Sequence, residues 1–413
     1  MRRIAGGVTA AKGFRAAGFE AGIKYRGRMD MAMIVSDVPC AAAGTFTSNR
    51  FQAAPVIWDR QVIEDGAAAQ AVVINAGIAN AATGEPGLAL CRKSAELTGA
   101  ALGLPASLVL LGSTGVIGPQ LPMDRIAAGI AGLAERLSDS REAGEAASRA
   151  IMTTDTVNKE AAVEFDLPAA EGDGTVTVRL GGMSKGSGMI HPNMCTMLAY
   201  LTTDCAICQP LLQKALRDVV RDTFNMISVD GDTSTNDSLI VLAGGRAGNR
   251  PILEEDESYA LFREALEAVC RELAIKMAGD GEGATHLIEM RVIHADTKEN
   301  ARILARAVVS SSLVKAMVYG RDANCGRILC ALGYAGPAFD PAAIGLWLVG
   351  PEENLCFYQE GRVLAFDEEK AAALMAEKEV RFLCDLKAGD AEATAWGCDL
   401  TYDYVKINGD YRS

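Results

Sequence analysis

Residues 181–204 read GGMSKGSGMIHPNMCTMLAYLTTD, a glycine-rich segment that runs directly into an apolar stretch typical of a buried strand. Four of the first eight residues are glycine, which adopts left-handed backbone conformations that other residues rarely tolerate. The segment therefore predicts sharp turns and close backbone approach just before a strand. An ordinary hairpin loop is the structural interpretation, and a binding or catalytic turn is the functional one.

The sequence on both sides of this segment alternates short β-rich runs with long amphipathic stretches. Strands are predicted at residues 31–37, 69–75, 107–113, 175–180, 196–203, 238–244 and 286–295. Helical periodicity is found at residues 87–103, 124–138, 209–226, 258–277, 297–319 and 368–380. Because the apolar faces of such helices pack on a sheet, the pattern indicates an α/β layered fold rather than a bundle of helices.

The domain organisation follows from length and from the C-terminal pattern. A chain of 413 residues, 49% hydrophobic and 23% charged, is large enough for two or three domains. A boundary near residue 285 predicts a catalytic domain over residues 1–285 and a smaller domain over 286–413. The last sixteen residues, CDLTYDYVKINGDYRS, alternate like a strand and end in a polar tip that is able to reach back to a site.

Composition excludes several classes of function. A formal net charge of -13 repels a phosphate backbone, so we expect no nucleic-acid partner. Eleven irregularly spaced cysteines are typical of the reduced thiols of a cytoplasmic enzyme. No apolar run approaches the roughly 18 residues of a spanning helix, so we expect no membrane partner, signal peptide or anchor.

Three chemical interpretations of the glycine-rich segment are open from its residues alone. A phosphate-binding loop is disfavoured, because Lys185 precedes Gly186 instead of following a glycine in the required spacing. A Cys195 nucleophile with His191 as its base requires a bend, since residues four apart in a strand lie about 13 Å apart. The third interpretation is that peptide cleavage releases Thr196, whose α-amine, with a pKa of about 8, then serves as base for its own hydroxyl.

The segment KGSGMIHPNMCTML resembles the autoprocessing motif KGSGMI-x-PNMATML of the ornithine acetyltransferase, or glutamate N-acetyltransferase, family. Cys195 stands where the family commonly has Ala, on the leaving side of the scissile bond. The resemblance continues in order along the chain. It covers GGVTAAKGFRAAG, STGVIG, MTTDT, SVDGDTSTND, DGEGATHLIE, YGRDANCGR, in which Cys325 replaces a common Trp, and YVKINGDYRS.

The resemblance implies a role for each matching residue. Autocleavage between Cys195 and Thr196 would give fragments 1–195 and 196–413, with Thr196 as the catalytic nucleophile. The other implied residues are Thr114 and Gly115 for the oxyanion, and Thr153, Thr154, Lys185, Glu282, Asn408 and Ser413 for substrate binding. A hydroxyl and a backbone N–H at a Ser-Thr-Gly turn suit an oxyanion, and the opposite charges of Lys185 and Glu282 suit an amino acid.

The resemblance also implies the activity, fold and assembly. It implies ping-pong transfer of acetyl from N-acetylornithine to glutamate in arginine biosynthesis, on an N-terminal-nucleophile-hydrolase-like helix/sheet/sheet/helix sandwich with a smaller C-terminal α/β domain. It further implies a heterotetramer of two α and two β fragments, without a cofactor. Whether acetyl-CoA is a second donor stays open. An autoprocessing aminopeptidase or amidase, or an unprocessed non-catalytic paralogue, is the alternative.

One further pattern, Cys205-Ala-Ile-Cys208, has the spacing of a redox pair or of half a zinc site. No second pair follows at a suitable spacing. We therefore interpret the two cysteines as small residues at the join between a strand and a helix, and expect no metal site.

Overall fold

The computed structural model describes residues 1–66, 68–191 and 197–410. The chain forms two compact units, each assembled from separate stretches of sequence. Unit 1 comprises residues 1–186, 193–223 and 233–273, and unit 2 comprises residues 187–192, 224–232 and 274–413. The predicted boundary at residue 285 and the predicted fragments stay predictions.

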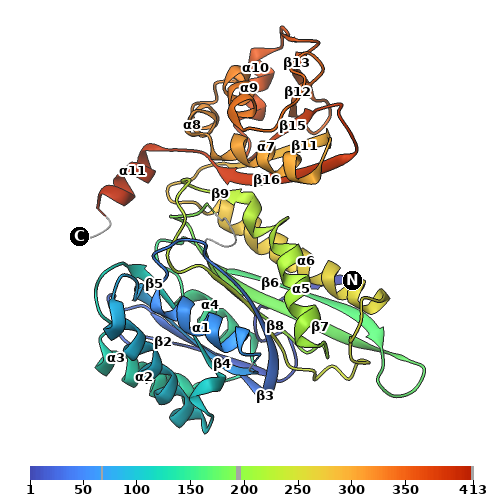
Figure 1. Ribbon diagram of the computed structural model, residues 1–413. Coiled ribbons are helices and arrows are strands. Elements are labelled where there is room, and N and C mark those ends of the chain that lie inside the picture. Colours follow the sequence, from blue (N-terminus) through green and yellow to red (C-terminus); the bar gives the residue numbers. More distant parts are fainter. Residues whose placement is uncertain (67, 192–196, 411–413) are drawn as a thin grey trace. The chain divides into compact units, whose positions relative to one another are not determined.

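Unit 1 is built on one mixed sheet of nine strands (Figure 1). Along the sheet the order is β1-β6-β7-β8-β10-β3-β4-β5, and β2 pairs with β3 beside this path. The strands are β1 Arg2–Ile4, β2 Phe14–Phe19, β3 Met31–Phe46, β4 Ala69–Ile78, β5 Val109–Val116, β6 Lys159–Pro168, β7 Thr175–Lys185, β8 Leu198–Thr203 and β10 Ser238–Ala243.

The long strand β3 belongs to both halves of this sheet. Its first half pairs with β2 and β4, and residues 41–46 pair with β10. The two halves pack face to face, because alternate residues such as Ile34 of β3 and Tyr200 of β8 share one apolar core. Gly112 of β5 leaves room for that ring, since a Cβ there would lie 2.0 Å from the Tyr200 hydroxyl oxygen.

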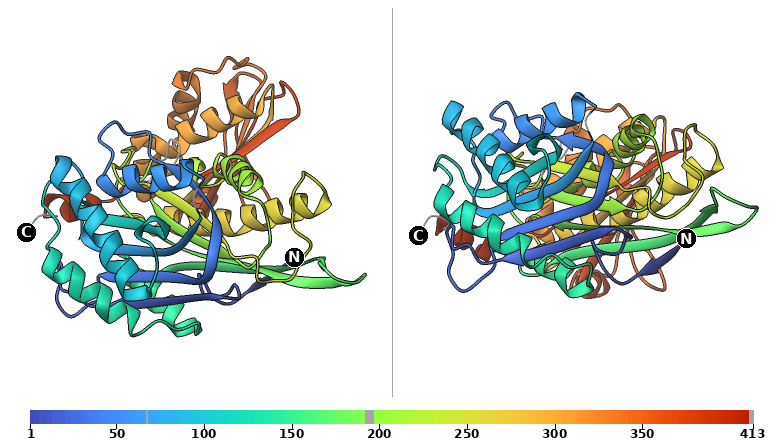
Figure 2. Two further views of the ribbon diagram at one scale, coloured as in Figure 1. Left: turned by 60° about the horizontal axis from the view of Figure 1, so that its bottom comes forward. Right: turned by 90° about the horizontal axis from the view of Figure 1, so that it is seen from below.

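Helices cover the outer faces of both halves, as two further views also show (Figure 2). Val73 and Leu111 point away from the inner core and pack with Ile126 and Ile130 of a covering helix. On the other half, Leu273 approaches Gly182 of β7. The helices are α1 Ala54–Glu64, α2 Gly84–Leu102, α3 Met123–Ala134, α4 Arg141–Ala150, α5 Gln209–Val220 and α6 Glu257–Gly279, with a 3₁₀ turn at Ala106–Leu108. The predicted α/β layered class is confirmed.

Side chains from helices form hydrogen bonds with backbone groups at two strand edges that have no neighbouring strand. Asp59 of α1 accepts a hydrogen bond of 2.8 Å from the Leu111 N–H, and the Trp58 indole donates to the Val109 carbonyl. Gln213 of α5 bonds both the N–H and the carbonyl of Gly44 at 3.0 Å. These contacts cover backbone groups that would otherwise recruit another strand.

Unit 2 contains a second, seven-stranded sheet in the order β14-β13-β12-β15-β11-β16-β9. Its strands are β9 Ile227–Ser228, β11 Leu287–Ala295, β12 Gly345–Val349, β13 Leu355–Gln359, β14 Arg362–Val363, β15 Glu379–Asp385 and β16 Ala391–Cys398. Its helices are α7 Lys298–Ser310, α8 Ser312–Gly320, α9 Cys325–Tyr334, α10 Glu368–Leu374 and α11 Tyr402–Gly409, with a 3₁₀ turn at Phe224–Met226.

Three predicted elements of unit 2 are wrong in detail. The C-terminal stretch is helix α11 rather than a strand, because the Thr401 hydroxyl caps the helix by accepting from the Tyr404 N–H. The helix predicted over 297–319 is two helices, since Ser311 is extended and caps α8. The helix predicted over 368–380 ends at Leu374, and Val380 lies in β15.

The pair α7 and α8 also bears on membrane insertion. Within the described part of the chain, no single helix has the length and apolar character needed to cross a membrane. Together α7 and α8 pass that test by length and composition, but the pair is bent by 54°.

Candidate active site

Three neighbouring strands of unit 1 begin or end at the same place in its sheet. β7 ends at Lys185, and Leu198, the first residue of β8, pairs with both Lys185 and Ser238 of β10. The Ser238 N–H also donates to the Met197 carbonyl at 2.8 Å. The predicted cleavage residues Cys195 and Thr196 lie outside the described residues, so their roles stay predictions.

Lys185 is buried at this edge beside a second buried cation. The Asp155 carboxylate lies 3.9 Å from the Lys185 ammonium through Oδ2 and 2.7 Å from the Lys159 ammonium through Oδ1. The Gly186 N–H also donates to Asp155 at 2.8 Å. Asp155 and Lys159 are fully buried, whereas the Lys185 side chain is 9% exposed. One carboxylate therefore holds two cations.

Neighbouring charges decide the ionisation of Asp155. Burial raises its pKa, but the charges of Lys185 and Lys159, with hydrogen bonds from Lys159 and Gly186, outweigh burial and hold the pKa below its ordinary value. Asp155 is therefore ionised at neutral pH.

The predicted substrate-contact motif MTTDT lies at the same place. Asp155 is its fourth residue, and the Thr153 N–H donates to Asp155 Oδ2 at 3.1 Å. Arg28 fixes the motif from the other side by donating to the carbonyls of Met152 and Thr153. Thr153 and Thr154 are both half-buried. The fold thus brings the predicted contacts Thr153 and Lys185 together through one carboxylate.

The predicted oxyanion residues lie at the end of β5. The sequence predicts Ser113, Thr114 and Gly115 in a turn after the strand, but all three are in β5 itself. Gly115 has φ +127°, and a Cβ there would lie 2.3 Å from the carbonyl carbon of its ladder partner Gly77. A non-glycine residue is therefore strained at this position. The sharp backbone geometry that the motif predicts is present, but it arises from the close approach of two strands.

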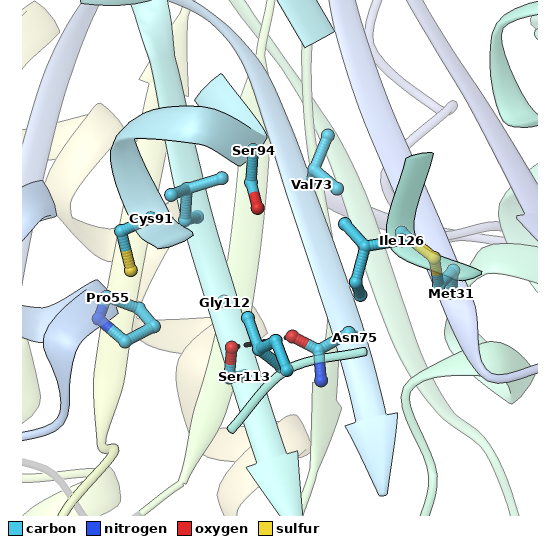
Figure 3. A pocket seen from close by; sticks show the side chains of 11 residues that line it. Met31, Pro55, Val73, Asn75, Cys91, Ser94, Gly112, Ser113 and Ile126 are labelled. Atoms are coloured by element: carbon cyan, nitrogen blue, oxygen red, sulfur yellow. Dashed lines mark hydrogen bonds between the residues drawn. The ribbon is translucent and has the colours of Figure 1, made fainter. Parts of the chain in front are cut away.

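A hydrogen-bonded pair supports this strand end. The Ser113 hydroxyl donates to the Asn75 side-chain oxygen at 2.6 Å, as Figure 3 shows. The two side chains line a pocket of about 20 Å³, together with apolar groups such as Val73 and Ile126. A volume near that of one water molecule is too small for an amino-acid substrate. The pocket is therefore part of the packing beneath the strand end.

Asn236 connects the end of β5 with the start of β10. Its side-chain amide donates to the carbonyls of Ala79 at 2.6 Å and Ser113 at 2.8 Å. The next residue, Asp237, is buried directly before β10, whose first residue, Ser238, donates to the Met197 carbonyl at 2.8 Å. The segment that contains Asn236 thus connects the predicted oxyanion strand with the strand that follows the predicted nucleophile.

The predicted substrate residues of unit 2 also lie together. The Asn408 side chain donates to Glu282 Oε2 at 2.7 Å, and the Glu282 N–H donates to the Ser187 carbonyl at 2.8 Å. A Cβ at Gly188 would lie 2.4–2.5 Å from the Glu282 carboxyl atoms. A larger residue at position 188 would therefore displace the Glu282 carboxylate from its present position. Ser413 lies outside the described residues.

Asp230 organises the surroundings of this pair. Its carboxylate accepts from the N–H groups of Met189 at 2.6 Å and Ile190 at 2.9 Å. The Tyr404 hydroxyl of α11 donates to the same carboxylate at 3.3 Å. The glycine-rich segment, the SVDGDTSTND motif and the C-terminal motif therefore meet within unit 2.

His191 is engaged by its own neighbours. Its Nδ1 lies 3.1 Å from the Ser228 hydroxyl, and its Nε2 lies 2.8 Å from the Arg306 guanidinium. Burial, reinforced by the charge of Arg306, lowers the pKa of His191 to about 4. A neutral ring that accepts from a guanidinium is a poor base for Cys195, so this geometry disfavours the cysteine mechanism.

The Cys205 and Cys208 pair precedes α5 as predicted. Cys205 is buried, and burial, together with the charge of Asp204, raises the pKa of its thiol to about 12. Its sulfur lies 3.7 Å from the Asn249 amide nitrogen. A thiol held protonated in this way is unsuited to redox exchange.

Three important residues were not predicted. Asp155 and Asn236 lie inside motifs that the sequence singled out, and the adjacent Asp237 closes the SVDGDTSTND motif. The motifs signal their importance, but only the register of β7, β8 and β10 shows that they surround one strand end.

Comparison with known proteins finds relatives that match this chain along its length. A model of the ArgJ family matches residues 15–413. Proteins named arginine biosynthesis bifunctional protein ArgJ are similar to it over its full length, at 53% identity in Symbiobacterium thermophilum and 46% in Caldanaerobacter subterraneus, with each chain covered completely. A crystal structure of a protein of that name from Bacillus halodurans is 43% identical, with a TM-score of 0.49, over 51% of this chain and 97% of that one.

Proposed function

Because this chain belongs to the ArgJ family, we propose that it transfers an acetyl group from N-acetylornithine to glutamate. The match over residues 15–413 confirms the family predicted from the sequence and the expectation of an acyltransferase of arginine biosynthesis. This full-length match is the observation that carries the proposal. The enzyme acts on small-molecule substrates.

The proposed reaction has two half-reactions. The Thr196 hydroxyl attacks the acetyl carbonyl of N-acetylornithine while the α-amine of Thr196 takes the hydroxyl proton. Thr114 and Gly115 stabilise the oxyanion, and the amine returns the proton to ornithine as the C–N bond breaks. The amino group of glutamate then attacks acetyl-Thr196, which regenerates the hydroxyl. The position of Ser113, tied by Asn236 to the start of β10, supports these assignments.

Charge supports the assignment of the substrate ends. Lys185 is a cation at an edge where Asp155 already neutralises one of two lysines, so a net positive charge is left for a substrate carboxylate. In unit 2 the buried Glu282 carboxylate accepts from Asn408 and suits a substrate amine. Thr153, Thr154 and Ser413 are proposed as further contacts.

The names of the relatives support a second donor. Both curated relatives are called bifunctional, and we extend this to acetyl-CoA as an alternative source of the acetyl group. We further propose a heterotetramer of two fragments 1–195 and two fragments 196–413, located in the cytoplasm. None of the ten described cysteines is in a disulfide bond.

Intact mass and activity test the proposal in the same preparations. We expect the wild type to consist of fragments 1–195 and 196–413 and to acetylate glutamate from both donors. Thr196→Ala should give one uncut, inactive chain, whereas Thr196→Ser keeps a hydroxyl and should still be cut.

Cys195→Ala is the matched control, because it restores the common family residue and removes no proposed catalytic atom. It should be cut and active. An uncut wild type that acetylates glutamate, or an inactive Cys195→Ala protein, contradicts the Thr196 mechanism. Transfer of acetyl to water instead of glutamate would favour the amidase alternative.

A further inference from the structure

Helix α11, residues 402–409, carries the proposed substrate contact Asn408. The structure describes the whole helix, and none of its residues is buried. Two of its larger apolar groups, Tyr402 and Val405, are 82% and 67% exposed. Burial of apolar side chains therefore contributes little to holding α11 in place, and its position depends on polar contacts with the rest of unit 2.

These polar contacts are spaced along the helix. The Thr401 hydroxyl, directly before α11, donates at 2.8 Å to the backbone carbonyl of the residue that follows Glu282. The Tyr404 hydroxyl donates to Asp230 Oδ2 at 3.3 Å, one turn further on. The Asn408 side chain donates to Glu282 Oε2 at 2.7 Å. Because Tyr404 and Asn408 are four residues apart, they lie on the same face of the helix.

Asp230, the partner of the tyrosine, is itself firmly held. Its carboxylate accepts from the N–H groups of Met189 at 2.6 Å, Ile190 at 2.9 Å and Asp232 at 3.3 Å. The adjacent Val229 N–H donates to the Ile190 carbonyl at 2.7 Å. The carboxylate therefore has a fixed place against the backbone, and a group that binds it is fixed in turn.

The Tyr404 hydroxyl keeps its proton for this contact. Burial, followed by the negative charges of Asp230 and Glu282, raises the pKa of Tyr404 above its ordinary value. The phenol is therefore a neutral donor throughout the neutral pH range.

The contact between Asn408 and Glu282 depends on where the far end of α11 lies. At 1.5 Å per residue, Asn408 is about 6 Å beyond Tyr404 along the helix axis. Without the Tyr404 contact, the helix is fixed at Thr401 but is free to pivot at the end that carries Asn408. The Glu282 carboxylate then loses its regular partner.

We propose that Tyr404 is a positioning residue which, through its hydrogen bond to Asp230, holds Asn408 against Glu282 and so sets the Glu282 carboxylate for the substrate amine. This inference rests on the proposed function, in which Glu282 binds the free side-chain amine of N-acetylornithine. Tyr404 acts through Asn408 and needs no contact with the substrate.

Tyr404→Phe tests the proposal, because it removes the hydroxyl and keeps the ring. We expect KM for N-acetylornithine to rise about threefold to tenfold, the range for a hydrogen bond of ordinary strength. The kcat should stay within about twofold, since no group that contacts the acetyl group is removed.

Tyr402→Phe is the matched control, because it removes a hydroxyl from the same helix. The Tyr402 hydroxyl has no hydrogen-bond partner among the described residues, and the phenylalanine ring keeps the edge-to-face contact with Tyr319. This variant should keep the wild-type KM and kcat.

Two further readouts separate positioning from a general loosening of the site. N-acetylnorvaline lacks the side-chain amine, so its inhibition constant should be the same in wild type and Tyr404→Phe to within about twofold. A loosened site would bind both compounds more weakly. In an Asn408→Ala background, adding Tyr404→Phe should change KM by less than about twofold, because the group that Tyr404 positions is already absent.

The outcomes distinguish this inference from the proposed function when Glu282→Ala is measured in parallel. If Glu282→Ala raises KM, the inference is overturned by an unchanged KM in Tyr404→Phe, by equal weakening of both compounds, or by additive effects of Tyr404→Phe and Asn408→Ala. The proposed function then stands. An unchanged KM in Glu282→Ala as well removes the amine site from the proposed function. If Tyr404→Phe is insoluble, Tyr404→Leu, which also lacks the hydroxyl, has the same expected and contradicting results.

Discussion

Two buried carboxyl groups flank Lys185, and the structure treats them in opposite ways. On the β7 side, Asp155 is paired with two lysines and with backbone N–H groups, which lower its pKa. On the β10 side, Asp237 forms no ion pair with any described residue, and burial raises its pKa. Both residues are buried aspartates, so residue type and exposure do not determine ionisation. The number and distance of the compensating groups do.

The two groups also differ in how completely their hydrogen bonds are satisfied. Asp155 has its hydrogen bonds and charges satisfied, as expected for a group that stabilises the fold. Oδ2 of Asp237 has no hydrogen-bond partner among the described residues, which is a cost to stability. The two positions should therefore respond differently to the same Asp→Asn change.

The largest expected effect is on stability, from Asp155→Asn. This change leaves Lys159 fully buried without its carboxylate, so the free energy of unfolding should fall by about 3–5 kcal/mol. Urea denaturation followed by circular dichroism measures it. Adding Lys159→Met should restore part of the loss, because the unpaired charge is then removed. An Asp155→Asn protein as stable as wild type contradicts the structural role.

An intermediate effect is expected on catalysis, from Lys185→Ala. If Lys185 binds a substrate carboxylate, kcat/KM should fall by about 1.5–3 kcal/mol, the range for hydrogen bonds to charged groups. Glu282→Ala should cause a loss of the same size through the substrate amine. Steady-state kinetics with N-acetylornithine and glutamate measure both.

Lys159→Met is the matched control for Lys185→Ala, because Lys159 contacts the same carboxylate but is fully buried. It should lower stability and should lower kcat/KM of the folded enzyme less than Lys185→Ala does, since it removes the surplus positive charge but no proposed substrate contact. Unchanged kinetics in both Lys185→Ala and Glu282→Ala would remove these two residues from the site.

The smallest effect is a difference in how stability depends on pH. The pKa of Asp155 is lowered by folding, so its contribution is present above the unfolded pKa of about 3.9 and is lost as pH falls through the folded value. The pKa of Asp237 is raised, so its contribution is present below about 3.9 and is lost as pH rises through the folded value.

Denaturation curves at a series of pH values test these opposite signs. Relative to wild type, Asp237→Asn should become progressively more stable as pH rises above about 4, because the asparagine has no proton to lose. For Asp155→Asn, the deficit should shrink only at acid pH. Parallel pH dependences in the two variants would contradict the assigned ionisation states.

Much of the fold was predictable because its signals are local. Apolar runs predicted the strands β4, β7 and β10, and periodic stretches predicted the helices α2, α5 and α6. Most of the predicted ends lie within a few residues of the observed ones. The helix α11 was missed, because an alternating pattern and a helix with no buried residue are hard to distinguish without the Thr401 cap. Short elements such as β9 depend on pairing with distant strands.

The sequence by itself determined the family, the α/β class and the motifs that hold the candidate site, because each of these is written in the order and type of residues. Only the tertiary structure decided which residues meet. The division of β3 between two half-sheets, the register that sets Lys185 beside Leu198, and the opposite ionisation of Asp155 and Asp237 all depend on contacts between segments far apart in sequence. The sequence shows only that a residue is an aspartate. The pKa of its carboxyl group depends on the burial and the charges that folding places around it.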